Sequence, residues 1–354
     1  MTPEEIGRLA ASVGALDEPS MAAAYERQLR LTKPTGALGK LEGLSLWLAG
    51  VQRAAPPRPF ARRRLVVFAG DHGVTARGVS AYPAEVTAQM VRNLLAGGAA
   101  ANVIARRVKV GVRVLDISVE GLTDVPPTVR QHHVRDGSGA IDKEPATTVD
   151  EALAALGAGI AVADEEVDGG ADLLIAGDMG IGNTTPSAAL TCAVAGTEPV
   201  DTVGRGTGID DFAWTRKVAV VRDALRRSRH KGLDPVRLLA ELGGADIAAM
   251  TGFLLGAAAR RTPVILDGVV PTAAALVVAR ISPQAVAYLA AGHRSTEPAH
   301  TAALLHLGLT PLLELDLRLG EGTGALLAVP ILDAAVDTIN DMATFDDAGV
   351  SDRS

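Results

Sequence analysis

One stretch, residues 172–186, constrains the fold more than any other. Its sequence is Asp-Leu-Leu-Ile-Ala-Gly-Asp-Met-Gly-Ile-Gly-Asn-Thr-Thr-Pro. The apolar beginning predicts a short buried strand, the glycines a loop, and Thr184 and Thr185 the start of an Ala-rich helix. A helix N-terminus offers unpaired N–H groups and partial positive charge, and glycines let a phosphate approach them. The stretch therefore predicts a phosphate cradle. A tight turn in which the threonines only cap the helix is an equal alternative.

A second stretch, residues 65–73, repeats this plan, because an apolar run again ends in Ala-Gly-Asp. Ligands of open α/β sheets bind beyond the carboxyl ends of the strands, so the repeat predicts two strand ends that open onto one crevice. Asp71 and His72 are therefore candidate site residues. His72 could act as a general base, although a single histidine in a loop more often has a structural role.

Six apolar segments are expected to form strands, and helical segments separate most of them. They lie near residues 65–69, 112–117, 172–176, 262–266, 286–291 and 312–317. This alternation predicts an α/β fold with a doubly wound, mostly parallel six-stranded sheet and helices on both faces. Aromatic residues make up only 3% of the chain, which favours helices packed closely on a parallel sheet over a β-sandwich.

The two ends of the chain are expected to form a small helical lobe beside the sheet. Met21, Tyr25 and Leu29 lie at helical spacing, and a Pro-rich linker at residues 55–59 precedes the first strand. We expect N-terminal helices over residues 1–58, an α/β nucleotide-binding domain over residues 59–330, and a C-terminal helix and tail over residues 331–354 that return to the lobe. The 354 residues, 48% of them hydrophobic, suffice for a well-buried core.

Charge and hydropathy narrow the possible partners. A formal charge of −7 argues against nucleic acid or an anionic membrane as the main partner. The most apolar region, residues 248–291, is interrupted by charged residues such as Arg260, Asp267 and Arg280, and no run reaches the roughly 18 apolar residues of a membrane span. The first residues lack the pattern of a secretion signal. A single cysteine, Cys192, excludes an intramolecular disulfide and a thiolate-built metal site. We expect a soluble, cytoplasmic protein.

Three further features suit an anion or a metal ion. Lys33 and Lys40 lie among glycines, which could hold a phosphate or carboxylate, although a solvated connection is the favoured interpretation. Residues 204–208 form a Gly-x-Gly-x-Gly loop before a helix, but the loop lacks the spacing of a dinucleotide fingerprint, and the chain has no Walker loop. His132 and His133 suggest a metal, yet neighbouring residues rarely converge on one ion without other ligands.

Glu321 lies between glycines, after the last expected strand and before a helix. Helix-start amides would keep this carboxylate ionised, whereas apolar neighbours such as Leu319 would make it more basic. A carboxylate held between these effects is a suitable general base, and a capping or first-turn acid is the equal alternative. Tyr82 and Gln89 offer a flat face and an amide that suit a heteroaromatic ligand, but they could equally be a packing residue and a polar helix residue.

Six motifs, in order along nearly the whole chain, point to one family. They are Lys-Pro-Thr-Gly-Ala-Leu-Gly-Lys-Leu-Glu at 33–42, Ala-Gly-Asp-His-Gly-Val at 69–74, Gly-Asp-Met-Gly-Ile-Gly-Asn-Thr-Thr at 177–185, Gly-Arg-Gly-Thr-Gly at 204–208, Gly-His-Arg-Ser at 292–295 and Gly-Glu-Gly-Thr-Gly at 320–324. Together they resemble the nicotinate-nucleotide:dimethylbenzimidazole phosphoribosyltransferases of cobalamin assembly. The resemblance implies transfer of the 5-phosphoribosyl group of nicotinate mononucleotide to 5,6-dimethylbenzimidazole, which gives α-ribazole 5′-phosphate and nicotinate.

The resemblance also implies residue roles. Glu321 matches the family's catalytic glutamate, which takes the acceptor's N–H proton while the opposite ring nitrogen attacks C1′ with inversion. The nucleotide side would comprise Asp178, Met179, Gly180, Asn183, Thr184, Gly206, Lys217, Gly268 and Ser295, and the base side Tyr82, Gln89 and Leu319. At Asp178 the chain departs from the family pattern, since relatives often carry glutamate there. The resemblance also implies a homodimer and no cofactor. It implies no metal, because the leaving group is nicotinate and not pyrophosphate.

Two other functions stay open on sequence grounds. Base exchange or nucleotide hydrolysis would use the same loops whatever the acceptor. A non-catalytic nucleotide-binding sensor could keep the fold, although a mere binder would not need a buried base such as Glu321. Benzimidazoles, adenine and phenolic bases all remain candidate acceptors, because a hydrophobic pocket discriminates a methyl group by only about 1–3 kcal/mol.

Overall fold

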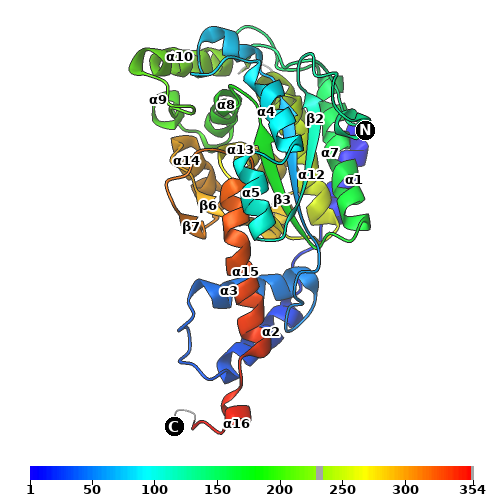
Figure 1. The fold of residues 1–354 in the computed structure, drawn as a ribbon, viewed down its shortest axis with the longest axis vertical. Helices are drawn as coiled ribbons and strands as arrows, with labels where there is room; N and C mark the ends of the chain where they lie inside the picture. The colour runs from blue at the N-terminus through cyan, green and yellow to red at the C-terminus, as the bar shows by residue number, and fades with distance from the viewer. Residues whose placement is uncertain (229–233, 352–354) are drawn as a thin grey trace.

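A five-stranded parallel sheet forms the centre of the computed structural model, which describes residues 1–228 and 234–351 (Figure 1). The strands are β1 (Arg63–Gly70), β2 (Gly111–Ser118), β3 (Leu173–Met179), β4 (Val264–Leu266) and β5 (Leu289–Ala291), in the order β2–β1–β3–β4–β5. Strands β1 and β3 lie side by side. Strand β2 pairs with β1 on one side, and β4 and then β5 follow β3 on the other side. The predicted doubly wound α/β fold is therefore confirmed.

The sixth expected strand lies outside this sheet, so the main sheet has five strands and not six. Strand β7 (Leu313–Glu314) pairs in parallel with β6 (His293–Arg294). Only Gly292 separates β6 from β5. The N–H of Leu312 donates to the carbonyl of Ala291, the last residue of β5, and the N–H of Leu313 donates to the carbonyl of Gly292. At Gly292 the chain runs so close to helix α15 (Thr323–Asp341) that a Cβ would lie 2.7 Å from the Cα of Ala325. This close approach to α15 separates the pair of β6 and β7 from the main sheet.

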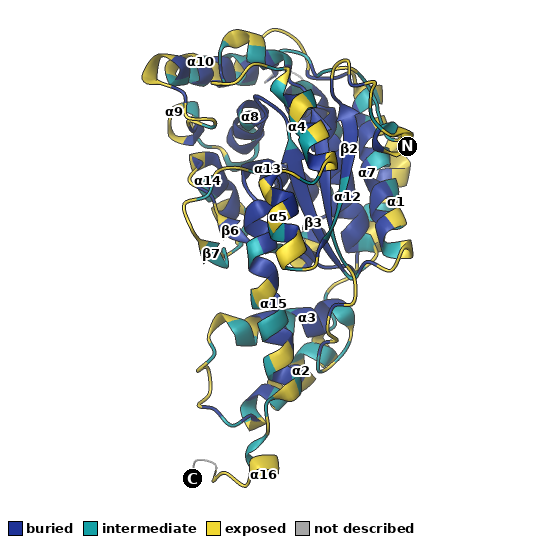
Figure 2. Cartoon of the chain, viewed as in Figure 1, coloured by how far each residue is buried: buried dark blue, intermediate teal, exposed yellow. Residues whose placement is uncertain are grey.

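Each face of the sheet has its own apolar core, because successive strand residues point to opposite faces. Val66 and Phe68 of β1 pack with helices α7 (Val149–Asp168), α8 (Thr184–Ala195), α12 (Ala245–Ala259) and α13 (Val269–Ile281). Leu65 and Val67 pack with α4 (Val86–Leu95), α5 (Ala100–Arg107) and the first half of α15. Figure 2 shows the sheet and the inner sides of these helices as buried. The predicted coverage of both faces is thus confirmed.

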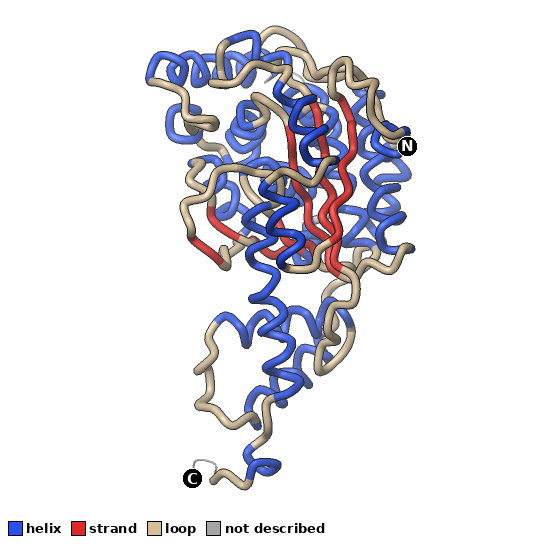
Figure 3. The backbone as a smooth tube through the Cα atoms, in the orientation of Figure 1, coloured by secondary structure: helices blue, strands red, loops and turns tan. Residues whose placement is uncertain are grey.

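The remaining helical segments surround this centre. They are α1 (Pro3–Ser12), α2 (Glu18–Arg30), α3 (Lys40–Gln52), η1 (Gly73–Arg77), α6 (Pro127–Arg130), α9 (Pro199–Thr202), α10 (Asp211–Ser228), α11 (Pro235–Leu238), η2 (Leu239–Gly243), η3 (Pro283–Tyr288), α14 (Pro298–Leu307) and α16 (Phe345–Ala348). Figure 3 shows most of the helices gathered around the strands and a smaller group apart from them.

That smaller group contains helices from both ends of the chain (Figure 1). Helices α2 and α3 pack against each other and against the second half of α15, and an isolated bridge joins Leu31 to Thr344. Helix α1 packs on α12 instead, within the larger body. Helix α15 runs without a break through Pro330 and belongs to both bodies. We propose that α2, α3, the end of α15 and α16 form the small lobe, and the division at residues 58 and 330 stays a prediction.

Helix α15 has the length and apolar composition of a membrane span, but 56% of that window is buried inside the protein. The helix packs against α3 and α5 and carries core residues such as Leu326 and Leu332 along its length. The core helix of a soluble protein passes the same test, so α15 is weak evidence for a membrane segment.

Helices α7 and α12 approach each other through glycine, and this contact yields a stability prediction. A Cβ on Gly159 would lie 1.7 Å from the carbonyl oxygen of Ala249. We expect Gly159→Ala to lower the free energy of unfolding by about 1–3 kcal/mol through overpacking, although alanine is the better helix former. The control is Gly157→Ala in the same helix, where the nearest atom is the Met1 Cβ at 3.3 Å. Urea unfolding followed by circular dichroism compares the variants, and equal stability would contradict the prediction.

Candidate active site

The carboxyl ends of β1 and β3 meet where the winding direction changes, and two adjoining cavities open at this edge. The outer cavity has a volume of about 470 Å³ and the inner cavity of about 40 Å³. Asp178, Asn183, Thr184 and Leu319 line both. The cavities thus lie at the edge of the sheet where these strands end, but only the end of β3 lines them, because Asp71 and His72 after β1 lie outside the lining.

The structure brings together most of the residues predicted from the sequence. The outer cavity is lined by Tyr82, Asp178, Met179, Gly180, Asn183, Thr184, Gly206 and Leu319, and the inner cavity also by Gly268 and Ser295. Lys217 lies behind Thr184, and Glu321 lies one residue beyond the lining residue Gly320. Gln89 does not join them, because it is exposed on α4 and lies outside the lining of both cavities.

Lys217 forms the cationic part of the site. Its side chain is fully buried, and Nζ donates to the hydroxyl of Thr184 at 2.7 Å and to the carbonyl of Gly204 at 3.2 Å. An ammonium has three donors, so these two bonds leave one for a ligand. Burial lowers the pKa of Lys217 to about 8. Thr184 begins helix α8, and the two residues therefore add a charge and a hydroxyl to the positive end of a helix.

The loop at residues 204–208 wraps around this lysine. A Cβ on Gly206, which has φ of +50°, would lie 3.2 Å from Nζ of Lys217 and 3.0 Å from the hydroxyl of Thr184. A side chain here would push both groups back by a few tenths of an ångström and would strain a backbone conformation that favours glycine. The N–H of Gly206 donates to the buried carboxylate of Glu297 at 2.7 Å, and Arg318 donates to its carbonyl. Both contacts hold the loop against the lysine.

Asp178 is a buried carboxyl group at the end of β3. Asn183 donates to it at 2.8 Å across the turn of the loop. Burial raises the pKa of Asp178 to about 8, and the nearby carboxylate of Asp267 adds to the rise. At neutral pH the group is therefore largely protonated, and it presents a polar but uncharged side chain to both cavities.

Glu321 occupies a strained turn between β7 and α15. Three successive residues have positive φ: Gly320 at 85°, Glu321 at 60° and Gly322 at 88°. The side chain is 3% exposed, and its carboxylate accepts the N–H of Ala101 at the start of α5, at 3.3 Å. Burial raises the pKa of Glu321 above the ordinary value, and the charge of Asp267 raises it further. The result is a carboxylate that is more basic than an exposed glutamate and lies beside the cavities.

His72 is buried and contacts a buried carboxylate instead of a cavity. Its Nε2 lies 3.1 Å from the fully buried carboxylate of Asp246, outside the lining of both cavities. Burial opposes the charging of His72, but the ion pair with Asp246 outweighs it and raises the pKa of the imidazole. Asp71 accepts the N–H of Glu120 and likewise lies outside the lining. These observations favour the structural role over the general base.

The other candidate ligands point elsewhere. Lys33 pairs with Glu42 at 2.8 Å, and Lys40 donates to a carbonyl. His132 and His133 contact different carboxylates, those of Glu165 and Asp116. Within residues 1–228 and 234–351, no group of three or more His, Cys, Asp or Glu side chains is placed to hold a metal ion.

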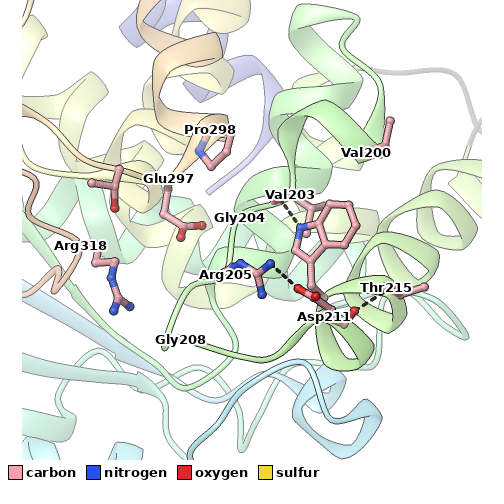
Figure 4. A pocket seen from close by; sticks show the side chains of 12 residues that line it. Val200, Val203, Gly204, Arg205, Gly208, Asp211, Thr215, Glu297, Pro298 and Arg318 are labelled. Carbon is pink, nitrogen blue, oxygen red and sulfur yellow. Dashed lines mark hydrogen bonds and ion pairs between the residues drawn. The ribbon is translucent and has the colours of Figure 1, made fainter.

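A third cavity of about 600 Å³ adjoins the site on the other side of the 204–208 loop. Figure 4 shows Arg205 and Asp211 paired on one wall and Glu297 and Arg318 on another. Neither the start of α8 nor the end of β3 lines this side cavity, whereas both line the outer cavity. We therefore take the outer and inner cavities as the candidate active site.

Sequence reasoning missed four residues around the site: Asp267, Glu297, His293 and Arg318. Asp267 ends a strand in Asp-Gly, and this resemblance to the Ala-Gly-Asp strand ends could have identified it. His293 lies within the Gly-His-Arg-Ser motif at residues 292–295, and Glu297 follows that motif by two residues. Nothing in the sequence indicated Arg318 as a site residue, because its contact depends on how the loop after β7 folds over Gly206.

Comparisons with known proteins agree with this arrangement. A family described as Phosphoribosyltransferase matches residues 13–350. Nicotinate-nucleotide-dimethylbenzimidazole phosphoribosyltransferases of Mycolicibacterium paratuberculosis and Mycobacterium tuberculosis are 58% and 57% identical over 346 and 344 residues. Each alignment covers 97% of this chain, with 98% and 95% of the relatives. The crystal structure of a protein of the same name from Thermus thermophilus, 46% identical, has a TM-score of 0.90 and covers 96% of this chain and 100% of its own. The chain therefore belongs to the nicotinate-nucleotide-dimethylbenzimidazole phosphoribosyltransferase family and is an enzyme.

Proposed function

We propose that the chain transfers the 5-phosphoribosyl group of nicotinate mononucleotide to 5,6-dimethylbenzimidazole, with Glu321 as general base and inversion at C1′. The observation that carries this proposal is the pairing of a cationic cradle, Thr184 with buried Lys217, and a basic buried carboxylate, Glu321, at one edge of the sheet. The high identity to enzymes of that name supports the choice of substrates.

The donor's phosphate fits the cradle at α8. Backbone amides at the start of α8, the Thr184 hydroxyl and the remaining donor of Lys217 together suit a phosphate dianion. Asp178 and Ser295 then lie on the ribose side, because they line the inner cavity next to Thr184. Gly268 and Gly180 let the nucleotide approach the backbone at two strand ends.

The acceptor base fits the apolar mouth of the outer cavity. Tyr82 and Leu319 are both more than half exposed and line that cavity, so a flat heteroaromatic ring would cover apolar surface there. Glu321 follows Leu319 by two residues and would take the N–H proton of the ring. Gln89 stays the least supported of the proposed base contacts, because α4 holds it in solvent.

The reaction needs no acid for its leaving group. The lone pair of one benzimidazole nitrogen attacks C1′, and the bond from C1′ to the pyridinium nitrogen breaks. Its electron pair returns to the ring, so nicotinate leaves with a neutral ring nitrogen. The proton of the other benzimidazole nitrogen passes to Glu321. Attack opposite the leaving group converts the β-linkage into an α-linkage.

Product analysis tests the proposal. Purified protein is incubated with nicotinate mononucleotide, with and without 5,6-dimethylbenzimidazole, and the products are separated by chromatography. We expect nicotinate only when the acceptor is present, together with an α-linked nucleotide identified by nuclear magnetic resonance. Nicotinate without acceptor would indicate a hydrolase, and donor binding without any turnover would indicate a nucleotide sensor.

The raised pKa of Glu321 predicts the acid side of the pH profile. The base must be deprotonated, so kcat/KM should fall on acidification with an inflection above the ordinary glutamate value of about 4.3. Initial rates at constant ionic strength between pH 4 and pH 8 give the inflection. An inflection at or below about 4.3 would contradict the prediction.

We propose a homodimer and a cytoplasmic location as further properties of the chain, supported by the family. The expected absence of a cofactor and of a metal is likewise a proposal. Sedimentation equilibrium of the full chain tests the dimer, and turnover after dialysis against a chelator tests the metal.

A further inference from the structure

Asp267, directly after β4, holds the turn that carries Glu321. Its side chain is fully buried and accepts three backbone hydrogen bonds. One oxygen accepts the N–H of Gly322 at 3.2 Å, and the other accepts those of Gly324 and Ala325 at 2.7 and 3.0 Å. These are the residue after Glu321 and the first turn of α15.

The turn needs such support because its backbone is strained. A non-glycine residue at positive φ, such as Glu321 at 60°, costs of the order of 1–3 kcal/mol and persists where the surroundings impose it. The backbone of the turn also crosses β3 closely, since a Cβ on Gly177 would lie 2.8 Å from the carbonyl oxygen of Glu321. Asp267 on one side and Gly177 on the other therefore fix the position of the turn.

A second contact links the same carboxylate to the donor side of the site. Nε2 of His293 lies 3.3 Å from Asp267, and His293 lines the inner cavity. The neighbouring His300 accepts the N–H of Ser295 at 3.0 Å and is uncharged, because burial lowers its pKa to about 3. Asp267 thus lies between the turn of Glu321 and the segment of Ser295, at the centre of the site but outside the lining of its cavities.

We propose that Asp267 is a positioning residue, which holds residues 320–322 in the conformation that places the Glu321 carboxylate and acts on the reaction through Glu321. This inference rests on the base role of Glu321 proposed above. A purely structural cap of α15 would stabilise the fold without coupling to Glu321, and the two possibilities differ in kinetics.

A double-mutant cycle tests the coupling. Asp267→Asn keeps the size of the side chain but replaces one acceptor oxygen by an amide that faces N–H donors. We expect kcat to fall about tenfold to hundredfold, since a displacement near 1 Å can cost about a hundredfold. The KM for nicotinate mononucleotide should change less than kcat, because Thr184 and Lys217 hold the phosphate away from Asp267. In the double variant, Asp267→Asn should lower kcat little below that of Glu321→Gln alone, because the effects of coupled residues are not additive.

The pH profile supplies a second readout, which reports the electrostatic coupling between Asp267 and Glu321. The charge of Asp267 raises the pKa of Glu321, so its removal in Asp267→Asn should shift the acid inflection of kcat/KM to lower pH. An unmoved inflection, or an equal loss of kcat in the wild-type and Glu321→Gln backgrounds, overturns the proposal. If Glu321→Gln itself retains the wild-type rate, the base role fails as well, which distinguishes the two failures.

Folding is checked by thermal unfolding of each variant. If Asp267→Asn does not purify as a folded protein, Asp267→Glu replaces it in the cycle, because it keeps both acceptor oxygens and the charge but displaces them by one methylene. The same coupling to Glu321 is expected, with kcat reduced in the wild-type background and unchanged in the Glu321→Gln background. Additive losses again overturn the proposal.

Discussion

Glu321→Gln should lower kcat by about a hundredfold to ten-thousandfold, the usual contribution of a general base. Glutamine has almost the same size and can still accept the N–H of Ala101, so the strained turn and its contact with α5 should persist. What is lost is the capacity to take the acceptor's proton. The KM for nicotinate mononucleotide should stay near the wild-type value. Steady-state rates of nicotinate release at saturating benzimidazole measure the effect.

Glu314→Gln is the matched control for this variant. Glu314 lies on β7, close in sequence to Glu321, but it is exposed and pairs with Arg294 at the surface. A surface pair contributes about 0–1 kcal/mol, so the control should retain the wild-type kcat. Full turnover by a folded Glu321→Gln protein that binds both substrates would contradict the base role.

The fold could be predicted because its signals are local. Apolar runs that end in Ala-Gly-Asp mark β1 and β3, and the order of helices and strands gives a doubly wound sheet. The sixth strand was harder to predict. Its separation from the main sheet follows from the close approach of Gly292 to α15. Such an approach depends on packing between distant segments, which periodicity does not contain.

The site shows the same division. Thr184 and the loop around Gly206 were predicted from a helix start and a glycine pattern, whereas Lys217 was assigned by resemblance. The three residues meet at one edge of the sheet. Gln89 was assigned by resemblance, but the rotation of α4 leaves it in solvent. Asp267 was overlooked, because its importance arises from three backbone N–H groups more than fifty residues away in the chain. The Asp-Gly strand end could have marked Asp267 as a candidate, but its backbone partners appear only in three dimensions.

Lys217→Met should raise the KM for nicotinate mononucleotide about tenfold to hundredfold, since a hydrogen bond to a charged group contributes about 1.5–3 kcal/mol. Methionine fills a similar volume, and loss of a fully buried ammonium removes a desolvation cost, so the fold should persist. Without Nζ, the cradle retains the Thr184 hydroxyl and the helix amides but lacks its positive charge. Calorimetric titration of the donor in the absence of acceptor measures the lost affinity directly.

Lys143→Met serves as the control, because Lys143 is largely exposed and lies 3.9 Å from its partner Asp142. The alkaline side of the pH profile gives a second comparison. Since the pKa of Lys217 is about 8, donor binding by the wild type should weaken above that pH, and Lys217→Met should lose this dependence. A dependence that persists in the variant would belong to Asp178, whose pKa is also about 8. Unchanged donor affinity in Lys217→Met would contradict the cradle itself, because no other buried cation lines up with the start of α8 among the residues described.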